Sequence, residues 1–323
     1  MRADGVFSGG GIKGLAFAGA LQAASEAGYG EWGKLGGTSA GAITAMALAV
    51  GYDAQGLHEV LDAFDFATIA DYGPAGPLSE AENFFVRHAL THGEVLHRWI
   101  RELLANAPHP ARVFGELEPD KLRVVGTDLV HARMVVFPED VTHYVDEHGR
   151  PLVPAEFPIA DAVRISAGYP YFFPPLKLRD AKTGKDGALV DGGVVAAFPV
   201  FLFDRPDPKH PTWGFRLFGG SAPEAPTYNA IDGLDWPLDM LRGVLDTSIN
   251  GLDTLELESF GDRVVAIPTG SVPTLQFSLS EAQKRFLYDS GYETAKTFFD
   301  AHPSGRNSFG VVPPKPAAVG ASP

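Results

Sequence analysis

The first fifty residues alternate between short apolar runs and helical patterns, and glycines mark each change. Residues 5–8 form an apolar run, residues 9–14 a glycine-rich loop, and residues 15–21 the beginning of a helical pattern. This order predicts a strand, a tight turn and a helix. A second run, residues 34–43, continues into an alanine-rich stretch that ends at Val50. We interpret it as another strand that turns into a helix packed closely against a sheet.

Further strands are predicted in the rest of the chain. Apolar or alternating runs occur at residues 122–128, 134–137, 187–190, 212–218 and 263–267, and such runs are typical of sheet strands. Strands separated by helical patterns are expected of an α/β fold.

Helical patterns separate these runs. The longest lies within residues 52–110, where one face carries Leu96, Trp99, Ile100, Leu103 and Leu104 at helical spacing. A shorter pattern covers residues 161–168, and another lies near residues 238–260. Ser278 with Glu281 predicts a capping box that starts a last helix running toward Asp300.

Two aromatic segments interrupt the patterns. Residues 64–77 are broken by glycine and proline and are either a lid or, the preferred interpretation, a surface loop. Residues 169–175 are aromatic and proline-rich, and they either line a pocket for an acyl chain or form a hydrophobic crossover in the core.

The composition is that of a globular protein with ample apolar residues for a core. The 323 residues carry a formal net charge of -14, which disfavours binding to nucleic acid or to anionic membrane surfaces. Cysteine is absent, which excludes disulfides and thiolate metal sites. The amino terminus lacks a signal peptide pattern and no run is long enough to span a bilayer. We expect a cytoplasmic protein, with export by a route without a cleaved signal left open.

Ser39 lies between Gly37 and Gly41, which is the pattern of a nucleophile elbow. A strand that reverses sharply into a helix strains its turn residue and tolerates only small neighbours. At the amino terminus of a helix, free amides and the helix dipole favour developing negative charge. The alternative is an ordinary helix start with Thr38 or Ser39 as the N-cap.

The glycine loop at residues 9–14 has three interpretations. Its backbone amides can form a nest for an anion or an oxyanion. Gly9, Gly11 and Gly14 also match the dinucleotide-binding pattern G-x-G-x-x-G. That pattern needs an acidic residue at a strand end about 20 positions on, whereas Glu31 lies in a segment that resembles a turn. The third interpretation is a tight turn whose glycines serve geometry alone.

Asp191 ends an apolar run and is followed by Gly192 and Gly193. A carboxylate at a strand end, with glycines that let other groups approach, is suited to act as a base. A turn stabilised by the aspartate side chain is the alternative.

A nucleophile, an anion nest and a base are the components that acyl transfer needs. Their order along the chain resembles that of the patatin-like phospholipases. The three motifs lie at residues 8–14, 37–41 and 191–193. Secondary agreement comes from Arg164 and residues 165–167 and from residues 194–200. The similarity spans roughly residues 5–300, so we expect one domain at residues 1–305 and a proline-rich flexible tail at residues 306–323.

The resemblance implies a three-layer α/β/α sandwich with a mostly parallel central sheet. It further implies Ser39 as nucleophile, Asp191 as its general base without a histidine, and the amides of Gly9, Gly10 and Gly11 as the oxyanion hole. Lys13, Gly14, Gly37, Gly41, Arg164, Gly192 and Gly193 support these motifs.

The reaction implied is hydrolysis of lipid esters, either phospholipids or lysophospholipids, through an acyl-serine and without a metal or cofactor. Transient contact with a membrane or micelle is expected, and the need for a protein activator is left open. A protein that binds acyl chains or a partner without turnover is the alternative.

The sequence departs from the family pattern at two positions. Ser8 replaces an aspartate that many members have, and Ala197 replaces a usual asparagine. The second departure bears on the loop that carries Asp191 and favours the alternative without turnover.

Three rival chemistries have weaker support. A Ser-His-Asp hydrolase would need a histidine after Asp191, and only His210 and His302 are there, each beside a proline. Histidines at positions 88, 92 and 97 lack a carboxylate-bearing zinc motif and are interpreted as a solvated helix face. A nucleotide-binding protein would leave Ser39 and Asp191 unexplained, and a Walker loop is excluded because Lys13 precedes Gly14.

Overall fold

A computed structural model of the protein describes residues 1–69, 89, 91–219, 261–273 and 278–302. The helix predicted near residues 238–260 and the tail predicted at residues 306–323 lie outside these ranges, as does most of the segment 64–77.

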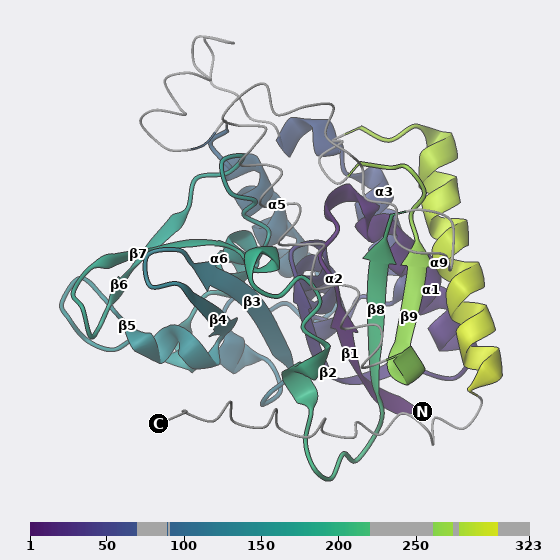
Figure 1. Ribbon diagram of the computed structural model, residues 1–323, viewed down its shortest axis with the longest axis horizontal. Helices are drawn as coiled ribbons and strands as arrows, with labels where there is room; N and C mark the ends of the chain where they lie inside the picture. Colours follow the sequence, from purple (N-terminus) through teal and green to yellow (C-terminus); the bar gives the residue numbers. More distant parts are fainter. Residues whose placement is uncertain (70–88, 90, 220–260, 274–277, 303–323) are drawn as a thin grey trace, which may run out of the picture.

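Nine strands in these ranges form one mixed sheet (Figure 1). Five of them run parallel in the spatial order β9-β8-β1-β2-β3, and the remaining four, β4 to β7, extend the sheet with antiparallel pairs. This confirms the mixed α/β fold with a mostly parallel central sheet. The strands are β1 Arg2–Phe7, β2 Glu31–Thr38, β3 Leu122–Asp128, β4 Arg133–Phe137, β5 Tyr144–Val145, β6 Leu176–Asp180, β7 Asp186–Asp191, β8 Thr212–Phe218 and β9 Val264–Pro268.

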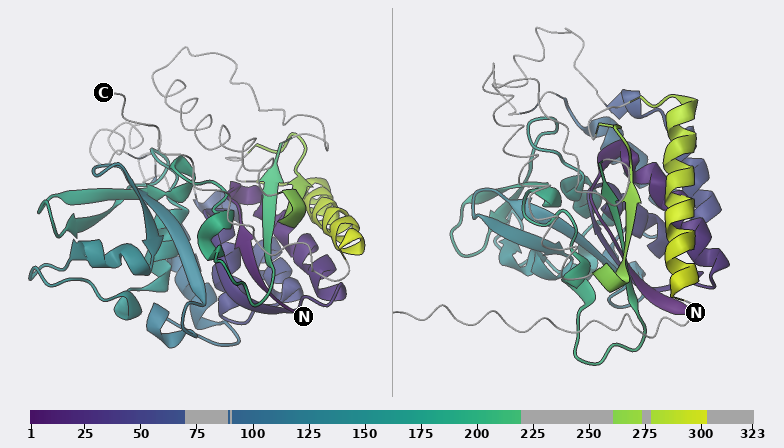
Figure 2. Two further views of the ribbon diagram at one scale, coloured as in Figure 1. Left: turned by 60° about the horizontal axis from the view of Figure 1, so that its bottom comes forward. Right: turned by 45° about the vertical axis from the view of Figure 1, so that its right-hand side comes forward.

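Six α-helices lie within the described ranges and pack on one face of the sheet (Figure 2). They are α1 Leu15–Glu26, α2 Ala40–Ala49, α3 Ala54–Ala63, α5 Glu94–Ala105, α6 Ile159–Ser166 and α9 Glu281–Ala301. Short 3-10 helices connect them, among them η1 Gly11–Gly14, η2 Phe66–Ile69, η6 Gly192–Val194 and η7 Val200–Phe203.

Alternate side chains of the strands point to the two faces of the sheet. Phe7 and Leu35 belong to the large buried cluster that contains the helices. Val6 and Val125 belong to a second, smaller cluster, which residues 196–203 cover from the other face. The sheet is therefore buried on both sides, as expected for parallel strands.

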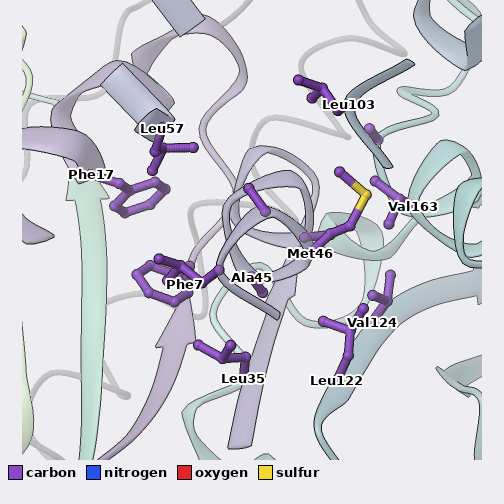
Figure 3. Close-up of a cluster of buried hydrophobic side chains, with 14 of the residues drawn as sticks. Phe7, Phe17, Leu35, Ala45, Met46, Leu57, Leu103, Leu122, Val124 and Val163 are labelled. Atoms are coloured by element: carbon purple, nitrogen blue, oxygen red, sulfur yellow. The ribbon is translucent and has the colours of Figure 1, made fainter. Parts of the chain in front are cut away.

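Helix α2 runs through the middle of the larger cluster (Figure 3). Ala45 and Met46 are fully buried, and Phe7, Leu35 and Val124 of three parallel strands face the helix. A helix that is apolar on all sides is expected in such a buried position. The alanines keep α2 thin, which lets it lie close to the sheet.

The last helix begins two residues later than the sequence predicts. Its capping box is formed by Ser280 and Gln283, in which the Gln283 N–H donates to Ser280 Oγ over 3.2 Å. The capping box predicted for Ser278 and Glu281 is therefore wrong.

Helices α9 and α1 touch through their backbones. A Cβ atom placed on Gly19 would lie 2.0 Å from the carbonyl oxygen of Tyr288, and one placed on Gly291 would lie 1.9 Å from that of Ala16. Glycine is required at both positions because no side chain fits there.

Candidate active site

Strands β2 and β7 meet end to end along one edge of β3, since β4 occupies the opposite edge. Thr38 at the end of β2 pairs with Val125, and Asp191 at the end of β7 pairs with the next residue, Gly126. Strand β2 runs parallel to β3 and β7 runs antiparallel to it, so their carboxyl ends face each other. This junction brings Ser39, the residue after β2, next to Asp191.

Ser39 forms a sharp turn between β2 and α2. Its backbone angles are φ 54° and ψ -121°, a conformation that is strained for a residue with a side chain. Two close approaches explain the neighbouring glycines. A Cβ on Gly37 would lie 2.5 Å from the backbone of Gly41, and a Cβ on Gly41 would lie 2.2 Å from the Phe7 carbonyl oxygen.

The Ser39 side chain makes no capping hydrogen bond to α2. The interpretation of Ser39 as an ordinary N-cap is therefore wrong, and its hydroxyl is directed elsewhere. The Asp191 carboxyl lies close enough for this hydroxyl to lower its pKa.

The glycine loop lies beside Ser39. A Cβ on Gly9 would be 3.5 Å from the Ser39 Cβ, so the loop is in contact with the turn at Ser39. The Gly9 N–H donates to the Ala197 carbonyl over 2.8 Å and is thereby removed from the expected oxyanion hole. Within the described ranges, the amides of Gly10 and Gly11 donate to no protein group, and Gly11 has a left-handed φ of 58°.

Ser8 ties the start of this loop to the sheet. Its hydroxyl accepts a hydrogen bond from the Leu217 N–H over 3.0 Å and donates to the Gly9 carbonyl over 2.9 Å. A serine at this position therefore supports the loop by itself.

The end of the loop packs on the start of α2. The Lys13 N–H donates to the Gly10 carbonyl over 3.3 Å. A Cβ on Gly14 would lie 3.1 Å from the Ala40 Cβ, which leaves little room for a larger residue.

Glu31 does not lie in a turn, contrary to the prediction from sequence. It begins β2 and pairs with Arg2 at the start of β1, whereas the glycine loop follows the other end of β1. Glu31 and the glycine loop therefore lie at opposite ends of strands β1 and β2, so Glu31 does not complete a dinucleotide site.

Asp191 ends β7, as predicted, and is buried with 3% of its surface exposed. Its Oδ1 accepts a hydrogen bond from the Gly193 N–H over 2.7 Å. A Cβ on Gly192 would lie 2.2 Å from the Val125 carbonyl oxygen. The two glycines thus allow the chain to turn tightly while one amide holds the carboxylate.

Burial raises the pKa of the Asp191 carboxyl to about 7. The loss of solvation disfavours the charged form, and the hydrogen bonds from the Gly193 N–H and the Ser39 hydroxyl oppose this effect because they favour it. A carboxyl with a pKa near neutrality can take up a proton at physiological pH.

The last residue of α6 and a residue just after the helix contact the two ends of the junction. The Ser39 N–H donates to Ser166 Oγ over 3.0 Å, and the Asp191 N–H donates to the Gly168 carbonyl over 3.0 Å. The role of Ser166 has no local signal in the sequence, because its contact joins segments 127 residues apart.

Arg164, two residues before Ser166 in α6, is buried with 3% exposure. Its Nε donates to the Gly93 carbonyl over 3.2 Å, and its guanidinium lies 4.7 Å above the centre of the Phe173 ring. Arg164 thus connects α6 to the start of α5 and to the aromatic segment.

The sequence model of the family described as Patatin-like phospholipase matches residues 5–204. This range is more than half of the chain and contains the glycine loop, Ser39 and Asp191. The chain belongs to the patatin-like phospholipase family.

Three individual proteins are similar to this chain. The uncharacterized protein YqhO of Bacillus subtilis is 33% identical over 302 residues, which cover 92% of this chain and 98% of YqhO. The uncharacterized protein R571 of Acanthamoeba polyphaga mimivirus is 24% identical over 295 residues, which cover 90% of this chain and 91% of R571. The crystal structure of VipD from Legionella pneumophila shares the fold, with a TM-score of 0.55 at 18% identity over 93% of this chain and 67% of VipD.

Membership in the patatin-like phospholipase family supports a general function in lipid hydrolysis. In the part of the chain that the structure describes, no helix is both long and apolar enough to cross a bilayer. The same part holds no group of three His, Asp or Glu side chains arranged for a metal ion.

The histidines considered for catalysis or metal binding make contacts away from Ser39 and Asp191. His210 Nε2 is 3.0 Å from Asp4 Oδ1, near the starts of the parallel strands, and His302 Nδ1 contacts the Phe298 carbonyl. His97 pairs with Asp161 over 2.9 Å. Position 88 lies outside the described residues.

The aromatic segment after α6 is part of the core. Phe172 and Phe173 are 7% and 4% exposed and belong to the larger buried cluster. These two rings favour the interpretation as a buried crossover.

Proposed function

We propose that this patatin-like phospholipase is a lipid acyl hydrolase in which Ser39 is the nucleophile and Asp191 is the general base. The observation that carries the proposal is the junction of β2 and β7, which brings Ser39 next to the buried Asp191 carboxyl. The pKa of that carboxyl is raised to about 7. Serine is a weak nucleophile unless an adjacent base takes its proton.

In the first half of the reaction, Ser39 Oγ attacks the ester carbonyl while its proton passes to Asp191. The carbonyl oxygen becomes negatively charged, and we assign its stabilisation to the amides of Gly10 and Gly11. A donor of this kind typically contributes about 2.7 to 4 kcal/mol to the transition state. Collapse of the tetrahedral intermediate breaks the ester bond, and the proton on Asp191 passes to the leaving alcohol.

In the second half, water attacks the acyl-Ser39 and gives a proton to Asp191. The same amides receive the carbonyl oxygen. The fatty acid is released and the proton returns to Ser39 Oγ, so no metal or cofactor takes part. The substrates we propose are phospholipids and lysophospholipids at a membrane or micelle surface.

Ala197 is compatible with this mechanism. Its contribution beside the site is its main-chain carbonyl, which accepts the Gly9 N–H, and Thr38 Oγ1 donates to the neighbouring Ala196 carbonyl over 2.9 Å. Any residue at position 197 provides the same carbonyl, so an asparagine side chain is not needed for these contacts.

The test is fatty acid release from a panel of phospholipids and lysophospholipids by the wild-type protein and by Ser39→Ala. We expect release by the wild type and a loss of about 10⁴-fold or more in the variant, which is the scale seen when a serine nucleophile is removed. Ser290→Ala is the matched control, since it removes a serine hydroxyl of α9 that donates to the Pro268 carbonyl at the end of β9.

Covalent labelling by a fluorophosphonate separates the outcomes. Labelling of the wild type but not of Ser39→Ala supports the assignment of the nucleophile. Absence of both labelling and release, together with retention of a bound acyl ligand, would favour a lipid-binding protein without turnover.

A further inference from the structure

Ser166 contacts the backbone of the turn that carries Ser39. Its Oγ accepts the Ser39 N–H over 3.0 Å, and the side chain is fully buried at the last residue of α6. The contact involves the main-chain amide of Ser39 and not its hydroxyl. Ser166 therefore fixes the position of the nucleophile's backbone.

Ser39 needs such support because its backbone is strained. A residue with a side chain at φ 54° and ψ -121° costs on the order of 1 to 3 kcal/mol, and it persists only where surrounding contacts hold it. The preceding residue, Thr38, is held by the Ala196 carbonyl, and the following helix is held where Gly41 meets Phe7. The amide of Ser39 itself is held by Ser166.

The same short segment also holds the base. Two residues after Ser166, the Gly168 carbonyl accepts the Asp191 N–H over 3.0 Å. Residues 166–168 therefore contact the main-chain amides of both Ser39 and Asp191, and α6 fixes that segment by packing on β3 and β7.

We propose that Ser166 is a positioning residue that holds the strained backbone of Ser39 and, together with Gly168, sets the separation between the Ser39 hydroxyl and the Asp191 carboxylate. The inference rests on the proposed function of Ser39 and Asp191. It assigns a function to a side chain that neither touches substrate nor exchanges a proton.

The test compares the wild type with Ser166→Ala and Ser166→Cys in the full chain. Alanine removes the acceptor, whereas cysteine keeps the side-chain volume but offers only a weak sulfur acceptor. For each protein, a fluorophosphonate burst gives the fraction of active molecules and the rate constant of Ser39 acylation. Steady-state hydrolysis of a soluble ester gives kcat and KM, and thermal unfolding gives Tm.

We expect acylation and kcat to fall about 10- to 100-fold in both variants, since a misplacement of about 1 Å has effects of that size. KM and the fraction of labelled molecules should stay near the wild-type values. A structural role alone would lower Tm and the labelled fraction without changing the rate per active molecule. Ser290→Ala, the control from α9, should match the wild type in labelled fraction, acylation rate constant, kcat and KM.

A folded Ser166→Ala protein with wild-type kcat would overturn the proposal. If Ser166→Ala does not fold, a wild-type kcat in Ser166→Cys would overturn it equally. Failure of the proposed function is distinguishable, because the wild-type protein itself would then show neither labelling nor release.

Discussion

Asp191 combines complete burial with the negative charge that a base needs, and these two properties oppose each other. Loss of solvation favours the neutral acid, while the Gly193 N–H and the Ser39 hydroxyl favour the carboxylate. The balance leaves the pKa at about 7. Near neutral pH, the protonated and the charged form of Asp191 are therefore both populated.

This balance predicts the pH dependence of turnover. Only the deprotonated carboxylate can accept the Ser39 proton, so kcat should rise as the pH increases through about 7 and level off about one pH unit above. The measurement is hydrolysis of an uncharged soluble ester between pH 5 and 9. A profile that is flat across this range would contradict the assignment of Asp191.

Asp191→Asn should abolish turnover and also stabilise the fold at high pH. Because the folded state raises the pKa of Asp191, its protonated form stabilises the protein at low pH, and this contribution is lost as the pH rises through about 7. The amide stays neutral at every pH. We expect the Tm of the variant to exceed that of the wild type by several degrees at pH 8, and by less at pH 5.

Thermal unfolding at the two pH values checks this expectation. Asp186→Asn serves as the control, since Asp186 is an exposed residue at the start of the same strand. An Asp191→Asn protein that is less stable than the wild type at pH 8 would show that burial does not oppose the charge at this position.

At the residue scale, local motifs revealed the candidates, but not how each atom is used. Ser39 stands out because glycines lie two positions away on either side of it, and Asp191 stands out because two glycines follow it. The engagement of the Gly9 amide by Ala197 and the support of Ser39 by Ser166 could not be predicted from the sequence. Both depend on hydrogen bonds between segments more than 120 residues apart.

Helices α1 and α9 approach each other closely enough for their backbones to touch. Gly19 and Gly291 each face a backbone carbonyl of the opposite helix at a distance that excludes a Cβ atom. The interface therefore depends on the absence of two side chains.

Gly291→Ala should destabilise the protein by about 1 to 3 kcal/mol, the usual cost of overpacking a core. Backbone atoms cannot move aside as a flexible side chain does, so the two helices must separate. Thr297→Ala, on an exposed position of the same helix, is the control and should be neutral or slightly stabilising. Denaturant unfolding monitored by circular dichroism measures both, and equal stability of the two variants would refute the contact.

Among the elements, those with strong hydrophobic patterns could be predicted from sequence. Strands β3 and β8 have the predicted bounds, and the five apolar residues predicted for one helix face are all buried in α5. The start of β2 was mistaken for a turn because Gly30 and Gly33 flank Glu31 and Trp32. Two overlapping serine patterns precede α9, and local sequence could not distinguish the one that caps it.

At the scale of the whole molecule, two groups of polar residues lie at opposite ends of the parallel strands. Near the starts of β1 and β2, buried Asp4 accepts the Lys34 N–H over 2.7 Å and pairs with Arg205 and His210. At the other end lie the glycine loop, Ser39 and Asp191. In the first group the Asp4 carboxylate is engaged by these neighbours, whereas the second group keeps two glycine amides without a protein partner in the described ranges.

The end-to-end junction of β2 and β7 has a consequence for how the protein matures. Ser39 and Asp191 are about 150 positions apart and become neighbours only after β3 has paired with both strands. Such distant pairings form slowly, because closing long loops costs chain entropy. Reactivity of Ser39 toward a fluorophosphonate therefore reports the completion of folding. In a nascent chain, Ser39 does not react with this reagent until β7 has been synthesised and has paired with β3.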